Sequence, residues 1–114
     1  MAFGESITIG DLLYVKSDGA VWKANAGTTG SYPASCLALE TGSTGSHLVL
    51  LHGIYRDDSR YAFNVGGIVY LSTTSGVETQ TQPSGTANAI QIMGLALTAD
   101  IIYFKPDLTY ITHV

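Results

Sequence analysis

Two histidines and two aspartates lie close together in the chain, and these residue types can bind metal ions or transfer protons. His47 and His52 are five residues apart, and in an extended strand this spacing places them on opposite faces. That is poor geometry for a shared metal ion. Asp57 and Asp58 are adjacent in a polar segment, where carboxylates are normally solvated. We therefore expect neither a metal site nor a pair of catalytic carboxylates.

Cys36 and a glycine-rich segment are the other places where chemistry could occur. Cys36 lies in the apolar run 34–39, which is typical of a core strand, and a lone buried cysteine behaves as a small hydrophobe. Nucleophilic catalysis would need a neighbouring histidine and an oxyanion donor, and neither lies beside it. Residues 42–46 faintly resemble a phosphate-binding loop but lack its lysine and its strand–loop–helix context. We expect no catalytic residue, no cofactor and no enzymatic activity.

The only dense cluster of charged residues runs from Asp57 to Arg60 and is flanked by two tyrosines. A solvated turn is the simplest interpretation, and an ion-pair loop at a protein interface is the alternative. Aromatic residues beside loops favour an interface, because Tyr and Trp are enriched at interface hot spots. The residues that we expect at an interface are Phe3, Trp22, Tyr32, Tyr55, Arg56, Asp57, Asp58, Arg60 and Tyr61.

The composition favours a protein whose surface is partly covered by a partner. Charged residues make up 12% of the 114 residues and hydrophobic residues 46%, whereas typical domains have about 25% charged residues. The net charge of -4 and the lack of a basic stripe disfavour binding to nucleic acid. No apolar run approaches the ~20 residues of a membrane helix. The first nine residues lack the pattern of a signal peptide, so we expect synthesis in a cytoplasm and no membrane partner.

We expect an all-β fold, because no stretch sustains apolar residues at helical spacing. Short runs of β-branched and aromatic residues alternate with turn residues, and their spacing suits a small β-sandwich or β-barrel. Leu48 to Leu51 contains no polar residue and is expected to be covered on both faces. The expected strands are 6–9, 12–16, 21–24, 36–40, 47–53, 61–63, 68–72, 77–80 (at an edge or on the surface), 89–97 and 101–105, with a short last one at 110–113.

The two halves of this single expected domain, 1–114, resemble each other. The run from Gly10 to Val15 parallels the run from Gly66 to Leu71, and residues 37–39 parallel residues 95–97 at an offset of 56 to 58 residues. A constant offset is what duplication leaves. The alternative is that unrelated β-hairpins share the same simple pattern. Duplication would give two β units, 10–53 and 66–105, that share one core.

Four segments of the second half carry a family resemblance. FNVGGIVYLSTTSG at 63–76, TQTQPSG at 79–85, QIMGLA at 91–96 and IYFKP at 102–106 follow in an order that resembles a segment common in structural proteins of tailed bacteriophages. GDLLYVKSDG at 10–19 is similar to bacteriophage head decoration proteins more generally. The resemblance implies a virion component and brings no catalytic residues. Because no heptads occur, it suits a capsid decoration (cement) protein better than a tail fibre.

The resemblance thus implies a protein made in the host bacterial cytoplasm that ends on the capsid exterior. There it would bind and bridge neighbouring major capsid protein subunits and stabilise the head. We expect a homo-oligomer, with a trimer favoured, and residues 1–6 as an N-terminal arm that is one anchor. The alternative is a tail- or fibre-associated module that binds a host-surface glycan, which an exposed coplanar row of aromatic side chains would indicate.

Overall fold

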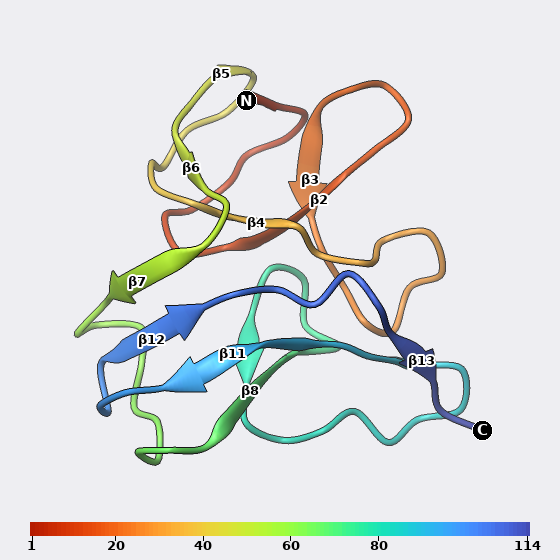
Figure 1. The fold of residues 1–114 in the computed structure, drawn as a ribbon. Helices are drawn as coiled ribbons and strands as arrows, with labels where there is room; N and C mark the ends of the chain where they lie inside the picture. The colour runs from red at the N-terminus through yellow and green to blue at the C-terminus, as the bar shows by residue number, and fades with distance from the viewer.

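The computed structural model describes residues 1–114 and consists of strands, turns and loops (Figure 1). Thirteen short strands form three sheets of six, five and two strands. The expected all-β fold is confirmed. No helix that could cross a membrane is present.

The first half of the chain forms the six-stranded sheet. Its order is β5 (Gly45–Ser46), β1 (Ala2–Phe3), β3 (Val21–Lys23), β2 (Leu12–Val15), β4 (Cys36–Ala38) and β6 (Val49–Leu50). The pair β1–β3 is parallel, and the other pairs are antiparallel. Residues 1–6 are therefore not a free arm, because Ala2 and Phe3 pair with two neighbouring strands.

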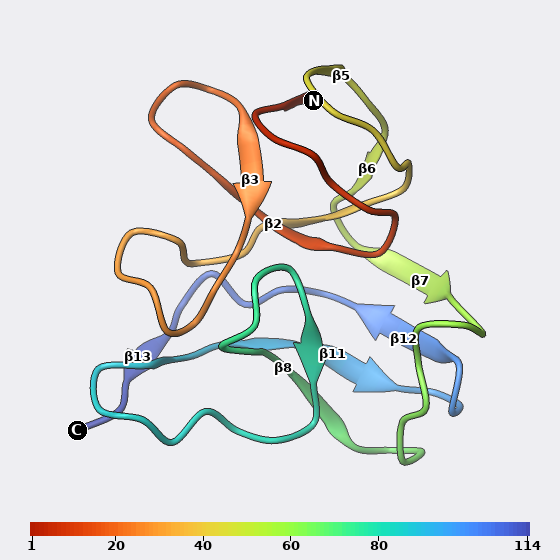
Figure 2. The ribbon, with the colours of Figure 1, turned by 180° about the vertical axis from the view of Figure 1, so that it is seen from behind.

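The chain from residue 53 onward forms the five-stranded sheet and a small two-stranded one. The larger sheet has the order β7 (Gly53–Arg56), β12 (Ile101–Phe104), β11 (Ile92–Ala96), β8 (Ile68–Leu71) and β9 (Glu78–Thr79), all antiparallel. The smaller sheet pairs β10 (Ala89–Ile90) with β13 (Ile111–Thr112). In Figures 1 and 2 the six-stranded sheet lies above the five-stranded one, with the N-terminus at the top and the C-terminus at the bottom.

Two hydrophobic clusters hold these layers together. The larger one lies between the two large sheets and includes Leu12 and Leu37 from the first sheet, and Val69, Met93 and Phe104 from the second. The smaller one lies on the other face of the first sheet. There the N-terminal segment covers the sheet; the members are Phe3, Ile7, Leu13, Val21, Cys36 and Ala38. The six-stranded sheet is thus covered on both faces.

The two large sheets share a strand order and a register. The order β3-β2-β4-β6 in the first sheet corresponds to β9-β8-β11-β12 in the second. Leu12 lies opposite Leu37, and Ile68 lies opposite Leu95, which are the same pairs moved along by 56 and 58 residues. A common register at the offset seen in the sequence is what a duplicated β unit would have.

Three expected strands differ from the structure. The stretch 47–53 is broken, because Gly53, with φ near +139°, turns the chain from β6 in one sheet to β7 in the other. Leu48 and Leu51, 64% and 60% exposed, are therefore not covered on both faces. Residues 61–63 lie in the loop between β7 and β8, and residues 6–9 contribute one isolated bridge, from Ile7 to Gly42.

The remaining expected strands lie close to observed ones. The expected strand 89–97 is divided into β10 and β11. β9 is an edge strand, as expected, and the short last strand is present as β13.

Candidate functional site

The charged segment 55–61 forms a turn that Asp57 organises from within. One oxygen of its carboxylate accepts hydrogen bonds from the Ser59 hydroxyl at 3.0 Å and from the backbone N–H of Arg60 at 3.1 Å. The other oxygen accepts a hydrogen bond from the Tyr55 hydroxyl at 3.1 Å. All three hydrogen bonds that the Asp57 carboxylate accepts thus come from its own turn.

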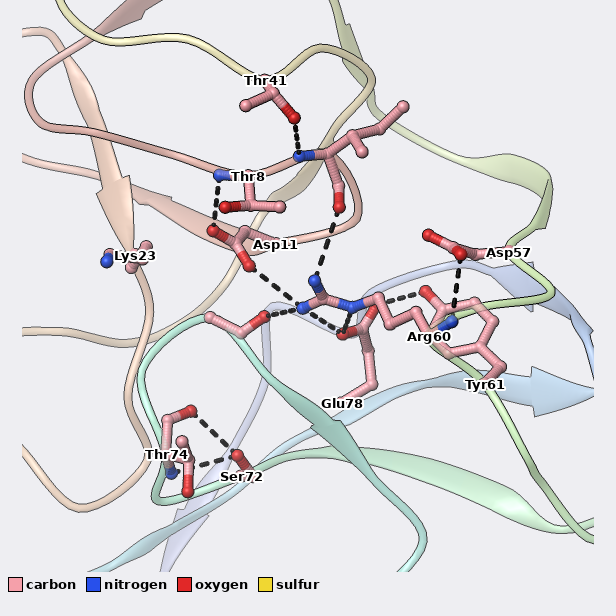
Figure 3. Close-up of polar contacts among 12 residues, drawn as sticks. Thr8, Asp11, Lys23, Thr41, Asp57, Arg60, Tyr61, Ser72, Thr74 and Glu78 are labelled. Carbon is pink, nitrogen blue, oxygen red and sulfur yellow. Dashed lines mark hydrogen bonds and ion pairs between the residues drawn. The ribbon is translucent and has the colours of Figure 1, made fainter.

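Arg60 joins the two halves of the molecule (Figure 3). Its guanidinium donates to Glu78 Oε1 at 3.0 Å, to Asp11 Oδ1 at 3.0 Å and to the Gly76 carbonyl at 2.8 Å. Asp11 directly precedes β2 of the first sheet, whereas Glu78 belongs to β9 of the second. The Tyr61 hydroxyl donates to the second oxygen of Glu78. We call Asp11, Arg60, Tyr61 and Glu78 the clasp.

The ionisation of the clasp is shaped by its burial. Only 1% of the Glu78 side chain is exposed, and this burial raises the pKa of Glu78 to about 7, although the Arg60 guanidinium acts in the opposite direction. Burial also raises the pKa of Tyr61, and the nearby Glu78 carboxylate adds to that effect. For Arg60, burial opposes ionisation, but Glu78 and Asp11 outweigh it and raise the pKa. The clasp is thus a structural ion-pair network between the two halves of the molecule.

Three of the nine residues expected at an interface are therefore corrected, and two more, Asp57 and Arg60, are only partly exposed. Phe3, Tyr55 and Tyr61 are buried in the chain's own core, at 2%, 8% and 4% exposure. Asp57 and Arg60 make the internal contacts described above. Sequence reasoning assigned these residues to a surface because it cannot show that a charged loop folds back against another strand.

The other four expected residues reach the surface. Arg56 and Asp58 form an exposed ion pair at 2.8 Å beside β7. Their mutual attraction raises the pKa of Arg56 and lowers that of Asp58. Trp22 is half-buried, and its indole N–H donates to Asp18 at 3.2 Å. Half-buried Tyr32 packs edge-on against Tyr110, with 4.9 Å between the ring centroids.

An apolar row crosses the outward face of the five-stranded sheet. Ile54 lies opposite Tyr103, Tyr103 lies opposite Leu95, and Leu95 lies opposite Ile68. Directly opposed residues project from the same face of a sheet, so these four side chains are neighbours across four strands. A second pair, Ile92 and Tyr70, lies next to the row on that face. We call these six residues the outer face.

The outer face is poor in charge, and four of its six side chains are exposed, whereas Tyr70 and Leu95 are half-buried. Ile54 is 68% exposed, Ile68 and Ile92 are each 41% exposed, and Tyr103 is 40% exposed. Arg56, which is paired with Asp58, is the only charged outward side chain within these strands. Contiguous exposed apolar patches rimmed by polar residues mark interaction sites. The outer face is therefore the candidate functional site.

The position of the outer face in the fold supports this assignment. Its row Ile68–Leu95–Tyr103 has the same place in its sheet as the row Leu12–Leu37–Leu50 in the other. That second row packs into the larger hydrophobic cluster, against the five-stranded sheet. The same strand positions are thus covered by protein in one half of the molecule and exposed in the other.

The residues first considered for chemistry are dispersed in the structure. The Nδ1 atom of His47 lies 2.9 Å from Glu40 Oε1, and its ring stacks on Phe3, whereas His52 lies near the end of β12. Cys36 is buried in the smaller cluster, and burial raises the pKa of its thiol. No group of three or more His, Cys, Asp and Glu residues is placed to hold a metal ion.

Sequence reasoning did not identify the outer face, although the sequence contains a signal for it. Both IVYL in β8 and IIYF in β12 are apolar at every position, so neither face of these strands has the polar residues of a solvated face.

Comparison with known family models, curated proteins and solved structures found no match to this chain.

Proposed function

We propose that this protein is a capsid decoration protein of a tailed bacteriophage and that its outer face binds the major capsid protein. The apolar row Ile54–Tyr103–Leu95–Ile68, in which all side chains but the half-buried Leu95 are exposed, is the observation that carries the binding role. The virion setting comes from the resemblance of residues 63–106 to bacteriophage structural proteins.

The physical basis of the proposed role is burial of apolar surface between neighbouring subunits. Burying one large aliphatic or aromatic side chain stabilises a contact by about 1.5–3 kcal/mol. A row of four such side chains can therefore anchor a small protein on a larger shell. A homo-oligomer, with a trimer favoured, would present several outer faces at once, and multivalency would strengthen the attachment and bridge adjacent capsid subunits.

Binding of purified protein to expanded capsids that lack it tests the proposal. Ile54→Asp places a carboxylate at the most exposed position of the row and should weaken binding at least about tenfold, because a buried unpaired charge is costly. Leu48→Asp is the matched control, because Leu48 is 64% exposed but directly precedes β6 of the six-stranded sheet, outside the outer face. The measurement is capsid occupancy by co-sedimentation over a protein titration.

Two results would contradict the proposal. The first is that the unchanged protein does not bind capsids from the phage that encodes it. The second is that Ile54→Asp binds as well as Leu48→Asp. The mass of the purified protein in solution separately tests the trimer, since a monomer at every concentration would contradict it.

A further inference from the structure

A hollow of about 440 Å³ lies where the two halves of the molecule meet. It is formed by the link between β6 and β7, the residue before β4 and the segment that follows β12. Leu51 and Leu108, each 60% exposed, and the ring of Tyr103 line it together with Pro106. Its size is within the range of natural binding pockets.

The hollow has one cation, Lys105, and no acidic side chain in its lining. Lys105 and His52 both line it, and neither side chain forms a hydrogen bond or ion pair within the chain. Each of the other four Lys and Arg side chains has a partner in the chain, either a carboxylate or an aromatic ring. Those four are Lys16 over the Trp22 ring, Lys23 beside Glu5, Arg56 beside Asp58, and Arg60 in the clasp.

The acidic residue nearest in sequence does not neutralise this site. Asp107 is two positions from Lys105, but its carboxylate accepts the backbone N–H of Thr109 at 3.0 Å. It lines a different hollow, on the side of β10 and β13. The positive charge beside Leu51 and Leu108 therefore has no partner in the chain, whose net charge is -4.

We propose that this hollow receives an extended segment of the partner protein in which an apolar side chain adjoins a carboxylate. The apolar side chain would pack between Leu51 and Leu108, and the carboxylate would pair with Lys105 and accept a hydrogen bond from His52. Tyr103 belongs both to the hollow and to the outer face. A segment bound here therefore continues onto the outer face, so the inference rests on the proposed function and names the chemistry of its partner.

Labelled heptapeptides test the recognition without a capsid. One carries a central Leu–Glu pair, the second a Leu–Gln pair and the third a Ser–Glu pair. The Leu–Glu peptide should bind at least about fivefold more tightly than either of the others, which is the size expected for one surface ion pair or one partly buried side chain. Its binding should shift the amide NMR signals of Leu51, His52, Lys105 and Leu108.

Matched variants test which residues of the hollow recognise the peptide. Lys105→Met should remove the preference for Glu over Gln, whereas Lys23→Met, which removes the same charge elsewhere, should leave it intact. Leu51→Ser should weaken binding of the Leu–Glu peptide, whereas Leu48→Ser should not, because Leu48 is equally exposed but does not line the hollow.

The outcomes separate this inference from the proposed function. The inference is contradicted if no peptide binds at about 1 mM, if all three bind equally, or if Lys105→Met leaves the preference for Glu unchanged. The proposed function still stands in these cases if the protein binds capsids and Ile54→Asp abolishes that binding. If the peptides behave as expected but capsids do not bind the protein, the proposed function fails alone. Self-association that Lys105→Met abolishes would show that a second copy occupies the hollow and would also contradict the inference.

Discussion

At the scale of single residues, the Arg60 guanidinium has the most consequential contacts. It neutralises two carboxylates from opposite halves of the chain and also donates to the Gly76 backbone. Both carboxylates are largely buried, with 10% of the Asp11 side chain and 1% of the Glu78 side chain exposed. Removing the guanidinium would leave two buried acidic groups without a counter-charge.

Replacement of Arg60 by Met should therefore lower the free energy of unfolding by about 3 kcal/mol, because the partners of a buried ion pair pay their desolvation cost alone. Urea denaturation at pH 7 measures this change. Arg56→Met is the control, since Arg56 pairs with Asp58 in solvent and should change the stability little. Equal stability of the two variants would show that the clasp does not join the halves.

Glu78 makes the stability depend on pH. Because burial raises the pKa of Glu78 to about 7, the folded protein keeps a proton between pH 5 and 7 that the unfolded chain loses. The free energy of unfolding should fall as pH rises through this window, by about 3 kcal/mol from this residue, and change little above it. Glu78→Gln should remove this part of the slope when both proteins are denatured with urea from pH 5 to pH 8. An identical slope in the two proteins would contradict the assignment.

At the scale of elements, a bulge in β11 sets the register of the five-stranded sheet. The pairing of β11 with β8 shifts between Ile92 and Gly94. Gly94 has φ near +156°, and a side chain there would collide with the Tyr103 carbonyl of the next strand. The bulge brings Leu95 opposite both Ile68 and Tyr103, so the apolar row depends on it.

Gly94→Ala should accordingly lower the free energy of unfolding by about 3 kcal/mol, because the backbone of β12 must move. Gly30→Ala separates this collision from the cost of a positive φ. Gly30 has φ near +90° with nothing near its missing side chain, so alanine there should cost about 1–2 kcal/mol. Thermal denaturation of both variants gives the comparison, and equal losses would mean that the collision is relieved at no cost.

The strands could be predicted from the sequence where turn residues flank a single apolar run, as at β2, β8 and β12. They were harder to predict where an apolar run crosses from one sheet to the other. Residues 48–51 look like one buried strand in the sequence, and only the turn at Gly53 reveals that the chain changes layer. The role of Tyr61 was not predictable for a similar reason. Its hydroxyl anchors the loop to Glu78, which lies far along the chain.

At the scale of the whole molecule, the N-terminal segment is part of the structure. Phe3 is 2% exposed and closes the smaller hydrophobic cluster. Phe3→Ala should lower the free energy of unfolding by about 3–5 kcal/mol, as expected for a large core side chain. Val65→Ala, at a position that is 71% exposed, should have almost no effect. If chemical denaturation shows the two variants to be equally stable, the segment does not contribute to the core.

The candidate site could be predicted from the sequence only in its general character. Low charge and many apolar residues indicated an apolar surface, and the structure has such a surface at the outer face. Its residues were not identified, because the sequence does not tell which of two equivalent apolar rows is inside. Leu12 and Ile68 have similar chemistry and equivalent positions, and only the packing of one sheet on the other distinguishes them.

The separation of the two hydrophobic clusters has a kinetic consequence. The smaller cluster is closed by a short segment at the start of the chain, and we expect it to open as a sub-global unfolding unit while the larger one stays intact. Cys36, the single cysteine, lies within that smaller cluster. Its rate of labelling by a thiol reagent therefore counts these opening events in the native protein, and a rate faster than global unfolding would give their frequency directly.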